Sequence, residues 1–336
     1  MAASPFTSTL LRWFAVHGRE LPWRGISDPY GIWVSEVILQ QTRIDQGTAY
    51  WLRFMERFPT VESLAAASED EVLRVWQGLG YYSRARNMHA AAGQIVALGR
   101  FPDTIEGLRA LKGVGEYIAA AVGSMAFGLP AAAVDGNFYR VLSRHYGIVT
   151  PINTTSGKRE FAALAAQLLP ADRPSAFNQA MMDFGATWCT PRAPRCADCP
   201  FAETCVALRT GRVGDLPVKE KKLKVLQRRM AYICVRHEGR IALHRRPAGD
   251  IWQGLWEPLL VEGADAVLPD LGCPLTPLAR GVKHVLTHRV ILADFYLASP
   301  QKQPALPPEY VWVAEQDISN YAVPRLVEKL FFLVRS

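Results

Sequence analysis

The stretch LKGVGEYIAAAVGSMAF, residues 111–127, joins a glycine turn to an apolar, alanine-rich helix. Gly113 and Gly115, one residue apart, allow the backbone to turn tightly and to approach a partner closely. The helix that begins after Gly115 presents free N–H groups, which can bind a phosphate. An ordinary turn between two helices explains the same residues, so the stretch predicts a helical hairpin without fixing its use.

Helical patterning extends from this hairpin over the whole of residues 1–205. Asp28-Pro29 is a good helix start, and apolar residues recur at helical spacing after it. Further helices are predicted around 45–58, 69–77, 81–98, 116–127, 137–146, 157–169 and 174–187. Glycine and proline separate these helices, and the sequence has no sustained β-alternation. This part is therefore predicted to be an all-α domain.

After residue 229 the pattern changes to that of a smaller α+β domain, residues 230–336. Runs of β-branched and aromatic residues predict four strands, which are separated by proline-rich loops. The strands are expected at 230–235, 240–244, 290–298 and 310–313. An amphipathic helix is expected at the end, from about 324 to 334. The chain is thus predicted to have two domains joined by a linker, residues 206–229.

The net charge of +7 is concentrated in that linker, which holds eight basic and two acidic residues. A basic segment can bind DNA phosphates with release of counterions, although a solvated linker explains it equally well. The longest uncharged run, residues 117–134, is broken by glycine and proline, and the first twenty residues lack a signal-peptide pattern. The composition, 49% hydrophobic and 21% charged, is that of a globular protein. We therefore expect a soluble, cytoplasmic protein without a membrane partner.

Four of the six cysteines lie within seventeen residues, in the spacing C-x6-C-x2-C-x5-C. They are Cys189, Cys196, Cys199 and Cys205. Paired zinc knuckles have a different spacing, and a compact set of four thiolates can hold a cubane iron–sulfur cluster. A structural zinc ion or disulfides remain as alternatives, the latter less compatible with a cysteine-poor chain. The loop 189–205 is therefore predicted to be a metal centre at the end of the helical domain.

Two carboxylates stand out in the helical part. Glu36 lies near Ile32 and Trp33 on a predicted helix, and apolar surroundings raise the pKa of a carboxyl group because they disfavour its charged form. Such a group can act as a general acid near neutral pH. Asp135 follows Gly115 by twenty residues, in the segment VDGN. A surface glutamate and a helix N-cap are the alternative interpretations of the two residues.

Together these segments resemble the helix-hairpin-helix base-excision DNA glycosylases, and within them the MutY-type adenine glycosylases, over nearly the full chain. The motifs that carry the resemblance are LPWR (21–24), SEVILQQT (35–42), GLGYYSRARN (78–87), VDGN (134–137) and the cysteine spacing. The resemblance implies a multidomain protein with a helix-hairpin-helix glycosylase domain and a 4Fe–4S cluster. It also implies a monomer that binds duplex DNA with adenine opposite 8-oxoguanine or guanine.

The resemblance further implies roles for residues at matching positions. Glu36 would protonate the adenine at N7, and Asp135 would stabilise the oxocarbenium-like sugar or attack it. Tyr117 and Asn137 would orient these groups. Endonuclease III-like relatives carry a nucleophilic lysine where this chain has Tyr117, which implies a monofunctional enzyme. The DNA contacts implied are Arg24, Gln40, Gln41, Thr42, Leu79, Tyr82, Gly113, Val114, Gly115, Thr287 and His288, with Tyr82 as the wedge that fills the space of the flipped base.

The C-terminal part resembles the Nudix (MutT-like) fold in RRP (245–247) and IWQGLWEP (251–258). The glutamate-rich, magnesium-binding Nudix box is absent from the sequence of 225–336, which implies recognition of 8-oxoguanine rather than hydrolysis. Leu286-Thr287-His288 stands where the family usually has Phe-Ser-His. Thr287 keeps the hydroxyl group, while Leu286 replaces an aromatic wedge. The motifs are less compatible with three other functions, those of a catalytically silent DNA-binding module, a nucleotide pyrophosphohydrolase and an electron carrier.

Overall fold

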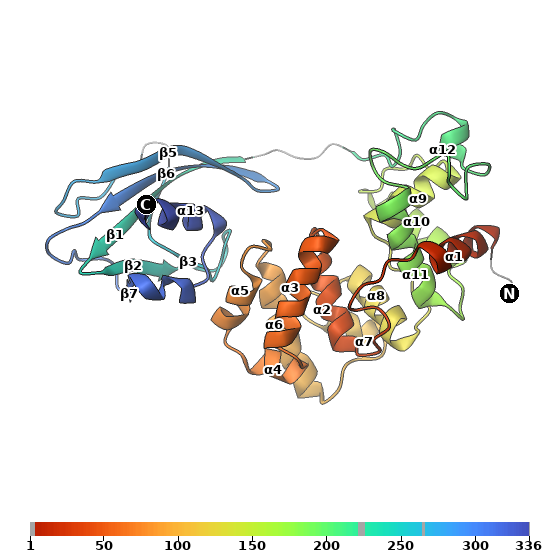
Figure 1. Ribbon diagram of the computed structural model, residues 1–336, viewed down its shortest axis with the longest axis horizontal. Coiled ribbons are helices and arrows are strands. Elements are labelled where there is room, and N and C mark those ends of the chain that lie inside the picture. Colours follow the sequence, from red (N-terminus) through yellow and green to blue (C-terminus); the bar gives the residue numbers. More distant parts are fainter. Residues whose placement is uncertain (1–3, 221–225, 264–265, 336) are drawn as a thin grey trace. The chain divides into compact units, whose positions relative to one another are not determined.

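The structure is a computed structural model that describes residues 4–220, 226–263 and 266–335. It divides into two compact units (Figure 1). The first comprises Met1–Ala66 and Asn87–Lys221, and the second comprises Ala67–Arg86 and Lys222–Ser336. The segment 67–86 therefore packs with the C-terminal part, although it lies within the predicted helical domain.

The first unit is helical, as predicted. Its elements are α1 (Pro5–His17), α2 (Pro29–Leu39), α3 (Ile44–Arg57), α4 (Val61–Ala66), most of α6 (Ser83–Leu98), α7 (Ile105–Ala110), α8 (Glu116–Phe127), α9 (Gly136–Tyr146), α10 (Thr155–Leu168), α11 (Pro174–Asp183), the π-helix η1 (Phe184–Trp188) and α12 (Val206–Arg209). Helix α1 was not among the predicted helices, although Ser4 caps it and Pro5 opens it.

Helix α2 lies at the centre of this unit. Asp28 caps it by accepting hydrogen bonds from the N–H groups of Tyr30 and Gly31, both at 3.1 Å. Its residues from Tyr30 to Ile38 are buried, and it packs against α8 and α3. A helix that is apolar on all sides belongs in a core. Any polar side chain on α2 is therefore held away from water.

The second unit is built on a seven-stranded mixed sheet in the order β3-β2-β1-β6-β5, with β4 beside β1 and β7 beside β2. Its strands are β1 (Leu226–His237), β2 (Arg240–Arg245), β3 (Trp256–Glu257), β4 (Leu259–Glu262), β5 (Thr276–Val285), β6 (Arg289–Ala298) and β7 (Val311–Ala314). Strands β1 and β6 run parallel, and the other pairs are antiparallel. The predicted α+β character is confirmed.

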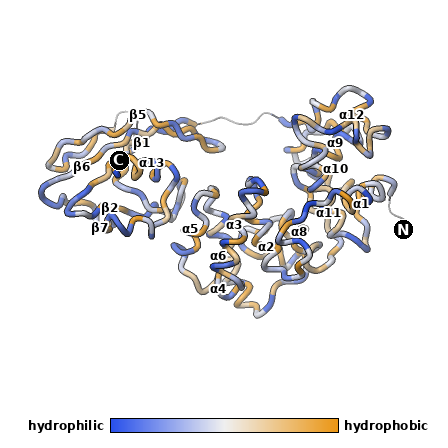
Figure 2. The backbone as a smooth tube through the Cα atoms, viewed as in Figure 1, coloured by the Kyte–Doolittle hydropathy of each residue, from blue (hydrophilic) through white to orange (hydrophobic). Residues whose placement is uncertain are grey.

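Helix α13 (Arg325–Arg335) covers part of the sheet, and α5 (Glu69–Trp76), the 3₁₀-helix η2 (Glu315–Asn320) and the segment 77–86 complete the second unit. Buried Leu326, Leu330 and Phe331 of α13 join the core of the sheet. Figure 2 shows hydrophobic and hydrophilic residues interspersed along both units. The segment 67–86 is tied to the sheet domain by hydrogen bonds, among them Arg86 Nη1 to the carbonyl of Gln253 (2.5 Å).

Three strands, β3, β4 and β5, were not predicted. Strand β5 begins in the predicted proline-rich loop and lies at the edge of the sheet. Register shifts between Pro277 and Ala279, and between Ala279 and Val282, interrupt its side-chain alternation. The sequence pattern therefore does not read as a strand.

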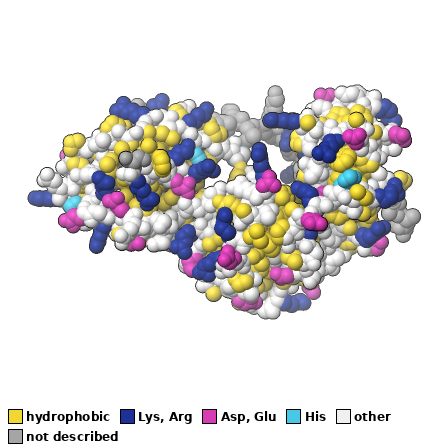
Figure 3. All heavy atoms as spheres, in the orientation of Figure 1, with side chains coloured by type: hydrophobic (Ala, Val, Ile, Leu, Met, Phe, Trp, Pro, Cys, Tyr) yellow, Lys and Arg dark blue, Asp and Glu magenta, His cyan; other side chains and the backbone are white. Residues whose placement is uncertain are grey.

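The predicted linker, residues 206–229, is not uniform in its secondary structure. It starts with the short helix α12, and its last residues form the start of β1. Residues 221–225, at its centre, lie outside the described part of the chain. On the face drawn in Figure 3, lysine and arginine side chains are spread over both units. No helix in the described ranges combines the length and the apolar character needed to span a membrane.

Candidate active site

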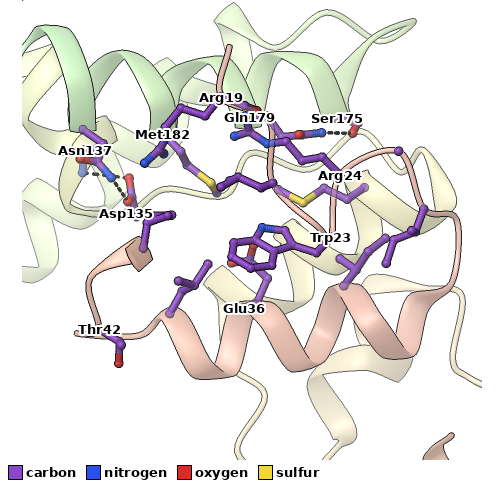
Figure 4. Close-up of a pocket in the computed structure, with 18 of the residues that line it drawn as sticks. Arg19, Trp23, Arg24, Glu36, Thr42, Asp135, Asn137, Ser175, Gln179 and Met182 are labelled. Carbon is purple, nitrogen blue, oxygen red and sulfur yellow. Dashed lines mark hydrogen bonds between the residues drawn. The ribbon is translucent and has the colours of Figure 1, made fainter. Parts of the chain in front are cut away.

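A pocket of about 810 Å³ opens in the first unit between the segment before α2, α2 itself, α8, the start of α9 and α11. Figure 4 shows Glu36 on α2, with Asp135 and Asn137 and the side chains of α11 around the same space. The polar residues that line it include Arg19, Arg24, Glu36, Thr42, Tyr117, Asp135, Asn137, Ser175 and Gln179. The structure thus brings together the four residues for which catalytic roles were expected.

Glu36 is the buried carboxyl group of this pocket, with only 4% of its surface exposed. Burial raises its pKa to about 7, and the nearby Asp135 adds to the rise, whereas the Tyr117 hydrogen bond and Arg24 oppose it. The hydroxyl of Tyr117 donates to Glu36 Oε2 at 2.6 Å. Burial and the neighbouring carboxylates hold the pKa of Tyr117 well above 10, so the tyrosine stays protonated. Glu36 can therefore give up or take a proton near neutral pH.

Asp135 is the N-cap of α9. Its Oδ1 accepts hydrogen bonds from the N–H groups of Asn137 and Phe138, both at 2.9 Å, and its Oδ2 accepts one from Asn137 Nδ2 at 2.6 Å. Burial raises the pKa of Asp135, and these hydrogen bonds and Arg140 oppose the rise. The positive end of the α9 dipole also favours the carboxylate. The residue is thus an N-cap and a pocket carboxylate at once.

Arg24 stands in the pocket wall and is held by the fully buried Asp183 at the end of α11. Its Nη1 and Nη2 donate to the two carboxylate oxygens at 2.7 Å each, and Arg19 Nε donates to Oδ1 at 2.9 Å. Hydrogen bonds from Arg24 and Arg19 lower the pKa of Asp183 despite its burial. The arginines are therefore fixed, and their charge is partly compensated.

Gln179 and Ser175 on α11 face the same pocket, and neither was singled out in the sequence. Gln179 Nε2 donates to Ser175 Oγ at 2.9 Å (Figure 4). This bond directs the amide N–H₂ toward α11 and leaves the carbonyl oxygen Oε1 as an acceptor. The four-residue spacing of Ser175 and Gln179 places both on one helical face, and that spacing is the signal that could have found them.

The glycine hairpin lies between α7 and α8, directly before Tyr117. Gly113 has φ of +77°, and a Cβ atom there would lie 2.6 Å from Asn87 Cβ, so both backbone and space require glycine. Val114 is buried, and Gly115 is the N-cap of α8. The hairpin is not part of the pocket wall; it fixes the start of the helix that carries Tyr117.

The segment after α2 contributes unequally to the pocket. Thr42 lines it, whereas Gln40 and Gln41 are outside its lining. Gln41 is exposed and has φ of +59°, an uncommon conformation for a residue other than glycine. It turns the chain between α2 and α3, and its side chain is accessible to a large ligand.

The expected lesion-contacting residues lie in the second unit, where Leu79, Tyr82, Thr287 and His288 line one cavity of about 560 Å³. Thr287 and His288 are exposed. Leu79 and Tyr82 are buried, at 9% and 7%, and Gly78 N–H donates to the Tyr82 hydroxyl at 3.3 Å. Tyr82 is therefore a core side chain here and not a free wedge.

Tyr81, not Tyr82, presents its ring at the surface of this cavity. It is 45% exposed, its φ is +46°, and its hydroxyl contacts the Thr287 hydroxyl. The preceding Gly80 also has positive φ, +72°. This backbone turns the second tyrosine of the pair inward and the first one outward, which the adjacency of the two residues in the sequence conceals.

All six cysteines are free thiols, so the disulfide alternative is not found. The four of the predicted metal loop line one small cavity of about 30 Å³, together with Trp188 and Arg144. Burial and the other cysteines raise the pKa of Cys199 to about 11. Within the described residues, no three Cys, His, Asp or Glu side chains are arranged around a single metal ion. The indole N–H of Trp188 is buried and has no hydrogen-bond partner.

An iron–sulfur cluster places different demands on its ligands than a single ion does. Thiolates that each bind a different iron do not need to converge on a point, and the four thiols line one cavity here. Arg144 Nη1 already donates to Cys189 Sγ at 3.4 Å. The four cysteines are therefore compatible with an iron–sulfur cluster.

Arg140 on α9 links the cysteine loop to the pocket. Its Nη2 donates to Asn137 Oδ1 (2.7 Å) and to the carbonyl of Gly185 (2.6 Å), and its Nε donates to the carbonyl of Cys189 (2.8 Å). Gly185 lies in η1, where a Cβ atom would be 2.5 Å from Asn137 Cβ. The π-helix thus packs tightly against the start of α9.

Two family models match the chain. Residues 34–169 match the HhH-GPD superfamily of base excision DNA repair proteins, and residues 230–332 match the NUDIX domain. The first contains Glu36, Tyr117 and Asp135, and the second spans the mixed sheet. The cysteine loop lies between the two matched ranges.

Among solved structures, a thermostable thymine-DNA glycosylase is similar, with a TM-score of 0.57 and 31% identity over 61% of this chain and 95% of that one. A non-covalent endonuclease III–DNA complex has a TM-score of 0.54 at 24% identity and covers 61% of this chain and 94% of that one, which supports the fold.

Curated relatives cover between 60% and 97% of the chain. The adenine DNA glycosylase of Mus musculus is 32% identical over 97% of this chain and 77% of its own length. That of Buchnera aphidicola from Schizaphis graminum is 31% identical over 75% and 73%, and the human enzyme is 42% identical over 60% and 39%. Because both domains and nearly the whole length agree, the chain belongs to the MutY-type adenine DNA glycosylases, enzymes of base-excision repair that act on N-glycosyl bonds.

Proposed function

We propose that the protein is a monofunctional glycosylase that removes adenine opposite 8-oxoguanine or guanine in duplex DNA. The observation that carries the proposal is the buried Glu36, with a pKa raised to about 7, in the same pocket as the N-cap carboxylate Asp135. Glycoside hydrolysis uses two such carboxyl groups in different environments, one as acid and one as anion.

The proposed reaction starts with the adenine flipped out of the stack, since the bond cannot be reached within the duplex. Glu36 transfers its proton to N7 of the base, and the glycosidic C–N bond breaks with its electron pair moving to the leaving adenine. Asp135 stabilises the positive sugar, either as a neighbouring charge or by bonding to C1′. Water then attacks C1′, breaks any bond that Asp135 has formed there, and gives its extra proton to the Glu36 carboxylate. Tyr117 orients the Glu36 carboxyl group through its 2.6 Å hydrogen bond.

Selection of adenine is proposed to rest on α11. With Nε2 of Gln179 donating to Ser175 (2.9 Å), the amide oxygen is left to accept from the 6-amino group of adenine. Guanine carries an acceptor at the equivalent position, so it would leave Gln179 Oε1 facing another acceptor. Arg24 adds a fixed donor on the pocket wall.

The proposed absence of a lyase step follows from Tyr117, which occupies the position of the nucleophilic lysine in endonuclease III-like relatives. A phenol has no amine nitrogen, so Tyr117 cannot form a Schiff base with the abasic sugar. We therefore expect strand cleavage only after alkaline treatment.

Contacts to the DNA are proposed for Gln40, Gln41 and Thr42 after α2, and for the hairpin of Gly113, Val114 and Gly115. In the second unit, Thr287 and His288 would read the base opposite adenine, with Leu79 beside them. Tyr81 replaces Tyr82 in our proposal for the wedge, because its ring is exposed and the Tyr82 ring is buried.

We propose that Cys189, Cys196, Cys199 and Cys205 bind a 4Fe–4S cluster, as is typical of the family. A bound cluster would supply cross-links that fix the loop 189–205 and place its basic residues near phosphates. The proposal further includes action as a monomer in the cytoplasm, and the domain bounds 1–205, 206–229 and 230–336.

The test uses duplexes with adenine opposite 8-oxoguanine, adenine opposite guanine, thymine opposite guanine, uracil opposite guanine, and thymine glycol opposite adenine. Abasic sites are scored with and without alkali under single-turnover conditions. Release of adenine, with strand cleavage only after alkali, is expected. Cleavage restricted to a pyrimidine duplex would overturn the proposal. Glu36→Gln and Asp135→Asn should each bind the lesion duplex and release no adenine.

A further inference from the structure

Asp250 lies in the loop between β2 and β3 and binds three arginines. Arg228 of β1 donates to both of its oxygens (2.7 and 2.8 Å), Arg289 of β6 donates to Oδ1 (2.8 Å), and Arg246 donates to Oδ2 (2.7 Å). The hydrogen bond from Arg228 is the largest cause that holds the pKa of Asp250 well below its usual value. The carboxylate therefore stays ionised throughout the neutral range.

Arg289 directly follows the turn Leu286–His288 that joins β5 and β6. The N–H of Leu286 donates to the carbonyl of Arg289 (2.8 Å), which closes the turn, and the N–H of Leu226 donates to the carbonyl of His288 (3.1 Å). The main chain of the turn is thus held by β1. The side chain of Arg289 ties the same turn to the β2–β3 loop.

The side chains of this turn and Asp250 line the same 560 Å³ cavity of the second unit. Thr287 and His288 are exposed in it, so a ligand can reach both side chains, and Thr287 also contacts the Tyr81 hydroxyl. Arg289 is 32% exposed and Arg228 is 22% exposed at the side chain. Arg228 also pairs with Glu262, so Arg289 is the arginine whose pairing depends on Asp250.

We propose that Asp250 is a specificity-determining positioning residue, which acts through Arg289 on the turn that carries Thr287 and His288. The inference rests on the proposed function, in which this turn distinguishes 8-oxoguanine from guanine. Asp250 also pairs with the guanidinium group of Arg289. Loss of its charge frees this cation beside the proposed lesion-reading turn, where it can contact a phosphate.

Asp250→Asn should therefore change two quantities in opposite directions. The ratio of single-turnover rates for adenine opposite 8-oxoguanine over adenine opposite guanine should fall about 5- to 10-fold, the size of one lost charged hydrogen bond. Affinity for an undamaged duplex should rise, and the slope of log affinity against log salt should steepen by about one, for the freed Arg289. A merely structural role would lower both quantities.

Two variants serve as controls. Asp294→Asn removes a carboxylate from the same strand as Arg289, at a residue that accepts a hydrogen bond from Gly281 N–H (2.7 Å), and it should leave the ratio unchanged. Arg289→Met should lower the ratio of the two excision rates, as Asp250→Asn does, but it should not gain affinity for undamaged DNA. In the double variant Asp250→Asn/Arg289→Met, the ratio should fall no further than in Arg289→Met.

Thermal unfolding of each variant identifies any that fails to fold. If Asp250→Asn fails to fold, the ratio of rates measured for Arg289→Met tests the inference alone. Unchanged ratios in Asp250→Asn and Arg289→Met, with a wild type that prefers 8-oxoguanine, would overturn the inference and leave the proposed function intact. A wild type that releases adenine equally from both duplexes would overturn the proposed lesion recognition, and the inference with it.

Discussion

Tyr117 on α8 donates a hydrogen bond from its hydroxyl group to Glu36 on α2 over 2.6 Å, in the interior of the helical unit. The bond joins the helix that follows the glycine hairpin to the helix that opens after Asp28. A neutral donor at this distance stabilises the carboxylate, so it partly offsets the burial that raises the pKa of Glu36. The pKa of Glu36 is thus set mainly by two opposing effects, burial and the hydrogen bond from Tyr117.

The first prediction concerns the pH dependence of excision. Glu36 has to be protonated to act as the acid, and its pKa is raised from 4.5 to about 7 in the folded protein. The single-turnover rate should fall as the pH rises through about 7. A single-turnover rate that stays constant from pH 6 to pH 9 would show that Glu36 is not the general acid.

The same group also makes stability depend on pH. The folded state binds a proton more tightly than the unfolded state, so its contribution is complete below pH 4.5 and is lost as the pH rises toward 7. Relative to Glu36→Gln, the wild type should lose roughly 3 kcal/mol of unfolding free energy between pH 4.5 and pH 8. Urea unfolding of both proteins over this range measures the difference.

Tyr117→Phe should move the alkaline limb of the rate profile to higher pH. The substitution removes the hydrogen bond that lowers the pKa of Glu36, and it keeps the ring in place. An unchanged limb would mean that the hydroxyl does not act on Glu36. Strand cleavage without alkali should remain absent, because phenylalanine provides no nucleophile.

The hairpin glycines offer a matched pair. Gly113→Ala should lower the unfolding free energy by about 1–3 kcal/mol, because φ is +77° and the new methyl group would meet Asn87 Cβ. Gly115→Ala is the control, since its φ is −92° and a Cβ atom there has no neighbour within 4 Å. Equal losses in the two variants would contradict the conformational explanation.

Tyr81 and Tyr82 should respond oppositely to alanine. Tyr82→Ala empties a buried site and should cost about 3–5 kcal/mol of stability. Tyr81→Ala should keep stability within about 0.5 kcal/mol, as is usual for surface positions, while weakening excision from the lesion duplex. Chemical unfolding and single-turnover assays separate the effects; the reverse pattern would return the wedge role to Tyr82.

Cys199→Ser tests the cluster proposal. The variant should contain less iron, unfold at a lower temperature and bind lesion DNA more weakly than the wild type, because one of four ligands is lost. Cys273→Ser, a thiol outside the loop 189–205, is the control for handling and oxidation. A wild type without iron would refute the cofactor assignment directly.

The catalytic pocket was accessible to sequence reasoning because its signals are local. Glu36 sits among apolar residues at helical spacing, and Asp135 sits in a cap motif before a helix. The family motifs then tied the two carboxylates together, which no periodicity does for residues about a hundred positions apart.

Other features depend on backbone conformation, which the pattern of residue types along the chain does not predict. Positive φ at Gly80 and Tyr81 decides which of two adjacent tyrosines is buried, and the register shifts in β5 erase the alternation of a strand. The grouping of segment 67–86 with the sheet domain rests on side-chain contacts such as that of Arg86, which have no signature along the chain.

Arg140 has a consequence for exchanging parts between relatives. Because one guanidinium group binds Asn137 and the carbonyls of Gly185 and Cys189 together, the cysteine loop is not a separable module. A chimera that receives this loop from another enzyme has to receive a compatible α9 and η1 as well. We expect the cysteine loop and the segments α9 and η1 to change together in evolution. In engineered variants they should be exchanged together.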